Sequence, residues 1–257
     1  MDWAQYYAQL SEMARAGQEL GFFDNFFRLF YQAFIEGNRW QLYLRGLVVT
    51  LQLTVIALCI GIVLGVLVAV VRTAHDQQRL GRRSIFLSFC NVLCQIYTTV
   101  IRGTPMMVQL LIWGFVIFSS SRNKTMVGAL GIGINSGAYV AEIVRAGLMS
   151  VDGGQAEAGR SLGLNYFDTM RYIVIPQAFK NILPALGNEF IVLFKDTSLV
   201  SAIGGAELIY YAKAVGSKTF EVMFPYLGVA VIYLTAVLIL TWLQGKLERR
   251  LRQSDRR

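Results

Sequence analysis

The sequence is short of charge. Charged residues make up 16% of its 257 residues, whereas a soluble domain of ordinary composition has about 25%. Hydrophobic residues make up 55%, and the mean hydropathy is +0.49. This balance argues against a soluble enzyme or a disordered chain and indicates an integral membrane protein. A long polar block is also lacking, so we expect no second, soluble domain.

Cysteine and histidine are scarce as well. The three cysteines, Cys59, Cys90 and Cys94, lie in apolar stretches and form no CxxC pair, and His75 is the single histidine. These numbers exclude a disulfide scaffold and predict no metal site. We interpret the cysteines as small buried hydrophobic residues.

Two further signatures are missing. The first 17 residues have neither a basic n-region nor an apolar h-region, so we expect insertion to depend on internal spans rather than a signal peptide. A nucleotide-binding P-loop needs G-x-x-x-x-G-K-[ST]. The nearest string, residues 216–219, has Ser217 between its glycine and lysine and lacks the upstream glycine. The sequence therefore predicts a non-catalytic chain that hydrolyses no ATP itself.

Long apolar runs define the candidate membrane spans. Residues 46–71 are 26 residues without a charge, about 39 Å of helix, and residues 222–245 are another 24. Both exceed the ~30 Å hydrocarbon core of a bilayer. Between them lie the apolar stretches 84–101, 103–121 and 125–141, and a weaker stretch, 181–206, which charges interrupt. These runs predict an all-α protein with five or six crossings.

The distribution of basic residues favours five crossings. Arginines cluster in residues 72–83, and lysine and arginine cluster in the tail 246–257, so both segments are expected on the cytoplasmic side. Six crossings would separate them. We therefore count 84–121 as one crossing preceded by a lead-in helix, with the N-terminus outside and the C-terminus in the cytoplasm. The net charge of +8 then reflects orientation and anionic lipid rather than nucleic acid.

The N-terminal residues 1–45 are expected at the outer face. Within them, Phe22, Phe26, Phe30 and Phe34 share one face of an amphipathic segment that is too charged to span the membrane. This pattern is typical of a helix lying in the lipid interface. A face for docking a partner is the alternative.

Residues 149–183 are too polar to span a membrane, yet they are regularly patterned. Asp152 is placed to cap a short helix that Gly163 would end. Asn165 or Asp168 could cap a second helix ending before Pro176. The segment is predicted on the same side as the basic tail. A rigid elbow of this kind suits contact with another protein.

This segment resembles the EAA loop of ABC importer permeases. The matching residues are Glu157, Ala158, Gly159, Gly163, Ile173 and Pro176, with three residues between the first two glycines and nine between Gly163 and Ile173. Gly159 replaces an alanine of the pattern, and Ile175 replaces a leucine. Residues 50–53, 102–105, 135–145 and 187–199 further resemble the polar amino acid subfamily, so the similarity covers about 210 residues from residue 46 onward.

The resemblance implies a permease domain over residues 46–245, with a cytoplasmic coupling loop at 149–183 between spans 3 and 4. It implies a dimer of cytoplasmic ATPase subunits that bind ATP and Mg, and an extracellular solute-binding protein. It also implies a second copy or a homologous permease, a polar amino acid as solute, and a bacterial inner membrane.

Charged residues within the predicted spans are costly, at about 2.5–3.5 kcal/mol each on insertion scales, so they must be paired or line water. Structural pairing is one interpretation. The other is a pathway for a zwitterionic solute, and its candidate residues are Arg102, Asn135, Tyr139, Glu142, Lys195 and Asp196. An ion-coupled secondary transporter is the alternative function, although it leaves residues 149–183 without a role.

Overall fold

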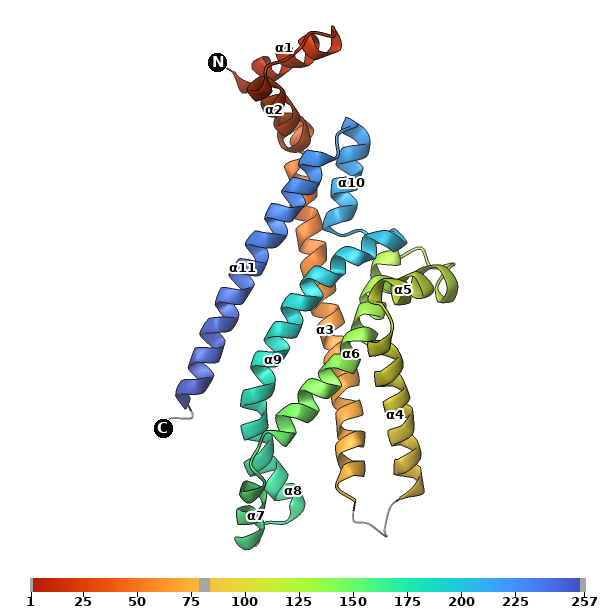
Figure 1. Cartoon of the computed structure of the whole chain (residues 1–257), viewed down its shortest axis with the longest axis vertical. Coiled ribbons are helices and arrows are strands. Elements are labelled where there is room, and N and C mark those ends of the chain that lie inside the picture. Colours follow the sequence, from red (N-terminus) through yellow and green to blue (C-terminus); the bar gives the residue numbers. More distant parts are fainter. Residues whose placement is uncertain (1, 79–83, 255–257) are drawn as a thin grey trace.

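The computed structural model describes residues 2–78 and 84–254, with side chains up to residue 251. All regular secondary structure in these ranges is helical (Figure 1). The α-helices are α1 (Trp3–Arg15), α2 (Phe22–Phe30), α3 (Trp40–Asp76), α4 (Ile85–Gly103), α5 (Met106–Leu111), α6 (Lys124–Met149), α7 (Gly153–Ser161), α8 (Tyr166–Thr169), α9 (Ile175–Asp196), α10 (Leu208–Thr219) and α11 (Met223–Ser254). Three π-helical segments, η1 (Tyr31–Ile35), η3 (Ile112–Ile117) and η4 (Met170–Val174), and two 3₁₀ segments, η2 (Glu36–Asn38) and η5 (Thr197–Ile203), join them. The all-α expectation is confirmed.

Within the described residues, four helices are long and apolar enough to cross a membrane: α3, α4, α6 and α11. Helix α9 has 22 residues, about 33 Å of helix, but its charged residues set it apart from these four. Counting α9 as a fifth span, and with it the orientation of the chain, stays a prediction.

Residues 84–121 differ from expectation in their internal order. We expected a lead-in helix followed by the crossing. Instead α4 is the helix of crossing length, and residues 106–117 form only a short helix beyond it. The break falls at Thr104, whose extended backbone (φ −120°, ψ 145°) precedes Pro105, as proline requires of the residue before it.

The core forms where α3 packs on α6. A Cβ on Gly65 would lie 2.6 Å from Cβ of Val140, and one on Gly61 would lie 2.7 Å from Oγ of Ser136, so only glycine allows this approach. Small and branched side chains fill the seam on either side, among them Leu53, Ala57, Ala129 and Ile132. Helix α6 also contacts α4, α5 and α9, so it is the central helix of the domain.

The N-terminal phenylalanine face packs in part on α11. The ring of Phe34 lies against Gly228 of α11 so closely that a Cβ on this glycine would be 2.5 Å from Cε1 of Phe34. The ring centres of Phe26 and Phe224 are 5.0 Å apart. Phe22 remains 78% exposed. The face therefore contacts this chain's own helix as well as its surroundings.

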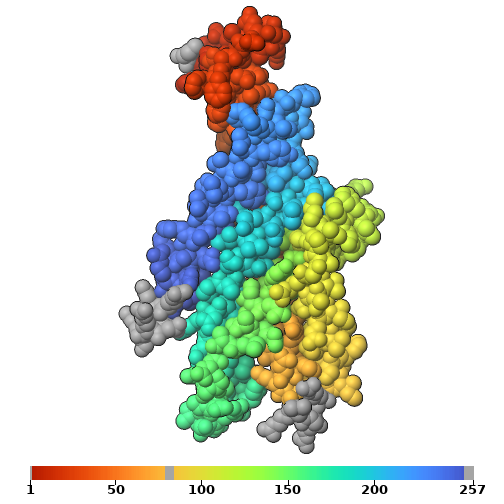
Figure 2. Space-filling view, in the orientation of Figure 1, coloured from red at the N-terminus to blue at the C-terminus, as the bar shows by residue number. Residues whose placement is uncertain are grey.

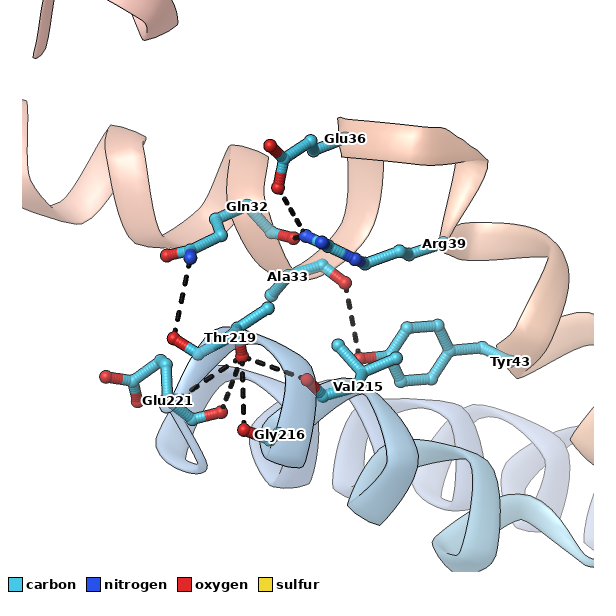
Figure 3. A network of polar contacts seen from close by, with 9 residues as sticks. All are labelled: Gln32, Ala33, Glu36, Arg39, Tyr43, Val215, Gly216, Thr219 and Glu221. Atoms are coloured by element: carbon cyan, nitrogen blue, oxygen red, sulfur yellow. Dashed lines mark hydrogen bonds and ion pairs between the residues drawn. The ribbon is translucent and has the colours of Figure 1, made fainter. Parts of the chain in front are cut away.

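Polar contacts attach the same segment to the end of α10 (Figure 3). Gln32 donates a hydrogen bond to the carbonyl of Thr219, and the Tyr43 hydroxyl donates one to the carbonyl of Ala33. Arg39 pairs with Glu36 across one turn. These contacts hold the short segments η1 and η2 against the start of α3.

Helix α10 was not anticipated from the sequence. Its N-cap is the fully buried Glu207, whose carboxylate accepts hydrogen bonds from the backbone of Ile209 and Tyr210. The hydroxyl of Thr50 in α3 accepts from the backbone of Leu208 at 3.2 Å. The string at 216–219 forms the last turn of this helix, whereas a P-loop precedes a helix.

The two ends of the molecule are built differently. Helices α1 and α2 form one tip, and α7 and α8 lie at the opposite end, near the end of α3 (Figures 1 and 2). That the N-terminal segment and residues 149–183 lie on opposite sides of a membrane stays a prediction. Arg79, Arg82, Arg83, Arg256 and Arg257, which support the predicted orientation, lie outside the described residues.

Candidate functional site

A cavity of about 190 Å³, lined by both polar and apolar side chains, lies where the α4–α5 break, α6 and α9 meet. Its walls are formed by Thr104, Met106, Asn135, Tyr139, Glu189, Val192, Leu193 and Asp196. The volume is several times that of one water, about 30 Å³, and below that of a drug-sized pocket. The cavity therefore suits a small solute.

Oxygen atoms dominate the polar part of this wall. Glu189 and Asp196 lie seven residues apart on α9, so both carboxylates are on one face of the helix. Glu189 is 8% exposed and accepts a hydrogen bond from the Ser136 hydroxyl at 2.7 Å. Glu189 is one of the charges that interrupt the apolar stretch 181–206, and it is not among the six predicted pathway residues. Its seven-residue spacing from Asp196 is the sequence signal that would have included it.

Three of the six predicted pathway residues meet at the cavity: Asn135, Tyr139 and Asp196. Arg102 lies next to it, with its guanidinium 5.3 Å from the centre of the Tyr139 ring. The structure does not place Lys195 in the wall, and its side chain is exposed.

Glu142 belongs to a neighbouring group of ion pairs. Its carboxylate pairs with Arg72 of α3, and it lies 3.8 Å from Arg102 of α4 and 4.0 Å from Arg145 of α6. Arg145 also reaches Asp76 at 3.3 Å. This arrangement fits the structural-pairing interpretation of Glu142, and a role in the solute pathway stays a prediction.

Gln109 is a buried polar residue beside the cavity that the sequence analysis did not single out. Its side-chain nitrogen donates toward the carbonyls of Ile101 and Thr104 and toward the Thr104 hydroxyl, at 2.7, 3.1 and 2.7 Å. Its side-chain oxygen accepts from Asn135 at 2.9 Å. Gln109 thus connects the α4–α5 break to α6.

The segment 149–183 folds into the predicted helix and turn. Asp152 caps α7, accepting a hydrogen bond from the backbone of Gly154 at 2.7 Å. Gly163 follows the helix with φ +83°, a left-handed conformation that favours glycine. Gly159 is the buried residue of α7 and packs on Ile173. A Cβ added to Gly159 would lie 2.8 Å from Cδ1 of Ile173.

The second helix differs from expectation at Pro176. Of the two predicted caps, Asn165 and Asp168, it is Asn165 that caps α8, by accepting from the backbone of Asp168 at 2.9 Å. The chain then continues through η4 directly into α9, so the expectation that a helix ends before Pro176 is wrong. Pro176 is the second residue of α9 and directly follows the π-helical turn η4.

The outer surface of this elbow is partly apolar. Leu162, Phe167 and Tyr172 are 82%, 67% and 64% exposed, and the Glu157 and Ala158 side chains also face solvent. Behind the elbow, the Tyr166 hydroxyl donates a hydrogen bond to the side chain of Gln77, the residue that directly follows α3. The elbow therefore combines an exposed apolar end with a brace to the membrane helices.

The chain matches the family model described as the binding-protein-dependent transport system inner membrane component over residues 85–253. The chain belongs to this family. The matched range contains α4 to α11, and so it includes both the cavity and the elbow. A permease role in ABC import is thereby supported over an ion-coupled secondary transporter.

Curated relatives agree with this assignment. The chain is 35% identical over 215 residues to the arginine transport system permease protein ArtQ of Bacillus subtilis, covering 82% of this chain and 93% of the relative. It is 36% identical over 215 residues to the glutamine transport system permease protein GlnP of Escherichia coli K12, with the same coverage.

Solved structures share the fold. A crystal structure of an amino acid ABC transporter with histidines matches with a TM-score of 0.73 and 42% identity, covering 82% of this chain and 94% of that one. An inward-facing structure of the methionine ABC transporter MetNI matches with a TM-score of 0.69 over 84% of this chain and 99% of its own, at 17% identity. The second match concerns the fold alone.

Proposed function

We propose that this chain is the membrane subunit of an ATP-driven importer for polar amino acids in a bacterial inner membrane. The observation that best supports the solute class is the cavity, whose carboxylates and amide suit the ammonium group of a small amino acid. The similarity to ArtQ and GlnP, named for arginine and glutamine transport, points to the same class.

In this proposal α7 and α8 dock into a cytoplasmic ATPase subunit. The exposed Leu162 and Phe167 supply apolar anchors, and the Glu157 carboxylate can accept charge-assisted hydrogen bonds from a basic partner. The ATPases form a dimer and bind ATP and Mg, while α7 and α8 of this chain transmit their movement to the membrane helices. The conformation of this docking segment depends on five further residues of the EAA-like pattern: Ala158, Gly159, Gly163, Ile173 and Pro176.

The assembly requires further partners. A second copy or a homologous permease completes the pair, and an extracellular solute-binding protein delivers the amino acid. We place α1 and α2 at the outer face in contact with lipid, α9 as the fifth span, and the tail from Lys246 in the cytoplasm.

Co-purification combined with uptake tests the proposal. The chain, expressed from its native operon with an affinity tag, is expected to retain an ATPase subunit, and cells are expected to accumulate radiolabelled L-arginine or L-glutamine. Asp196→Asn is expected to abolish uptake while the ATPase stays bound. A complex without an ATPase, or full uptake by the Asp196 variant, would contradict the coupling or the cavity assignment respectively.

A further inference from the structure

The orientation of one buried amide follows from its neighbours. Gln109 is 7% exposed, and its side-chain nitrogen faces three oxygen atoms. Two of them, from Ile101 and Thr104, are carbonyl oxygens, which only accept. The third is the Thr104 hydroxyl, whose hydrogen is already donated to the carbonyl of Val100 at 2.8 Å. All three oxygens therefore act as acceptors toward Gln109, so its side-chain nitrogen, with two hydrogens to donate, must face them; an amide oxygen in that place would meet acceptors alone.

Fixing Gln109 also fixes Asn135. With the nitrogen of Gln109 on the α4–α5 break, its Oε1 atom faces Asn135 and requires a donor in turn. Asn135 meets this requirement with Nδ2 at 2.9 Å. Because Asn135 lines the cavity and this bond holds its nitrogen side against Gln109, the Oδ1 atom is the acceptor that Asn135 can offer to a solute.

This orientation makes the polar wall uniform. The Glu189 and Asp196 carboxylates accept hydrogen bonds, and the Asn135 Oδ1 atom adds a neutral acceptor from the opposite helix, α6. An amide turned the other way would present a donor to the cavity and repel a cationic nitrogen. Three acceptors on two helices match an ammonium or guanidinium group.

We propose that Gln109 is a positioning residue that holds the Asn135 amide with its acceptor toward the cavity, so that Asn135 binds a cationic nitrogen of the solute. This inference rests on the proposed function, because it assigns a role at the same cavity. Gln109 itself lies outside the lining and acts only through Asn135.

Substituting both partners tests this role. Equilibrium binding of radiolabelled L-arginine, L-glutamine and L-glutamate is measured on the permease–ATPase complex in lipid nanodiscs without the binding protein. The amino acid that the wild type binds most tightly serves as the probe. Gln109→Met keeps the volume, removes every hydrogen bond and frees the Asn135 amide to rotate. We expect its affinity for the probe to fall about tenfold, the value of one hydrogen bond to a charged group.

Two double variants separate positioning from general stability. In the Asn135→Ala background, Gln109→Met is expected to add nothing, because the residue through which it acts is gone. Asn135→Asp presents an acceptor in either orientation, so Gln109→Met with Asn135→Asp is expected to bind within about threefold of the wild type. A packing defect would not be repaired in this way. Gln95→Met, the same change at an exposed position of α4, is the matched control and is expected to be neutral.

The outcomes distinguish the two proposals. If Asn135→Ala and Asp196→Asn leave binding of all three probes unchanged, or the wild-type complex binds none of them, the cavity is not the solute site and the inference fails with it. If those variants weaken binding but Gln109→Met does not, only the positioning role is overturned. An additive loss in the Asn135→Ala background, or no recovery with Asn135→Asp, also overturns it.

Discussion

Gly159 and Ile173 lie in direct contact, although 13 residues of chain separate them. A Cβ on Gly159 would be 2.8 Å from Cδ1 of Ile173 and 3.2 Å from Cγ2 of Thr169, so α7 rests on α8 and η4 with almost no space between them. These are the first and last parts of the EAA-like pattern. The pattern therefore describes the inner packing of the elbow as well as its surface.

A larger side chain at Gly159 should separate α7 from η4. We expect Gly159→Leu to insert and accumulate but to lose most of the co-purifying ATPase, because overpacking typically costs about 1–3 kcal/mol and displaces the docking helix. Gly159→Ala should be tolerated, since the closest contact of its Cβ is with the flexible end of Ile173 and alanine favours helix by about 1 kcal/mol. Quantitative pull-down of the ATPase measures both effects.

Gly153 provides the control for this substitution. It lies in the same helix, and a Cβ there meets no atom within 4 Å. Gly153→Leu should therefore retain the ATPase, and combining Gly159→Leu with Ile173→Ala should restore part of the binding. Equal losses for the two leucine variants would show that the contact with Ile173 is not the cause.

Gly163 tests the turn that ends α7. Its φ of +83° is unfavourable for residues with a Cβ, and an aspartate there adds negative charge near Glu157. We expect Gly163→Asp to lose the ATPase subunits and uptake while still accumulating in the membrane. Gly163→Asn, whose side chain is neutral and tolerates left-handed backbone better than most, should keep at least half of the uptake. Normal ATP-driven uptake by the Asp variant would contradict the coupling role.

The sequence was sufficient for features that depend on local chemistry. Asp152 as a cap and Gly163 as the end of α7 each follow from a residue type at a fixed offset, and the structure confirms them. For the second cap the sequence leaves Asn165 and Asp168 open, and the structure has Asn165. Long apolar runs likewise located α3 and α11. The solute class stays a proposal, although three predicted pathway residues meet at the cavity.

Features that depend on tertiary contacts were not predictable in this way. Pro176 signals a helix end, but η4 carries the helix into α9 without a break. Hydropathy does not distinguish α4 from residues 103–121, and the break at Thr104 decides which of them is the long helix. Gln109 has no local signal for its role, because its partner Asn135 lies on another helix.

The orientation of the chain can be measured directly. With Cys59, Cys90 and Cys94 replaced, a single Ser254→Cys at the end of α11 should react with a membrane-impermeant maleimide only after the cells are opened. The physical reason is the basic tail, which favours the cytoplasmic side. Asn25→Cys in α2 should react in intact cells and serves as the outer-side control. Labelling of Ser254→Cys from outside intact cells would refute the five-span topology.

Glu142 is expected to stabilise the membrane helices through the charges that surround it. It faces three guanidinium groups from α3, α4 and α6, and the side chain of Arg72 is only 16% exposed. Glu142→Gln keeps the size of the side chain but leaves these cations without their shared carboxylate. We expect the free energy of unfolding to fall by about 1–3 kcal/mol, seen as a lower thermal midpoint of the purified complex.

Asp76→Asn is the matched control for this prediction, because Asp76 pairs with Arg145 from a side chain that is 51% exposed. Exposed pairs contribute about 0–1 kcal/mol, so its midpoint should change little. Uptake measured on the same variants then decides between the two interpretations of Glu142. A lowered midpoint with uptake that recovers at lower temperature indicates structural pairing. An unchanged midpoint with uptake abolished for every amino acid tested would instead assign the Glu142 carboxylate to the solute pathway, since the helices would then hold together without it.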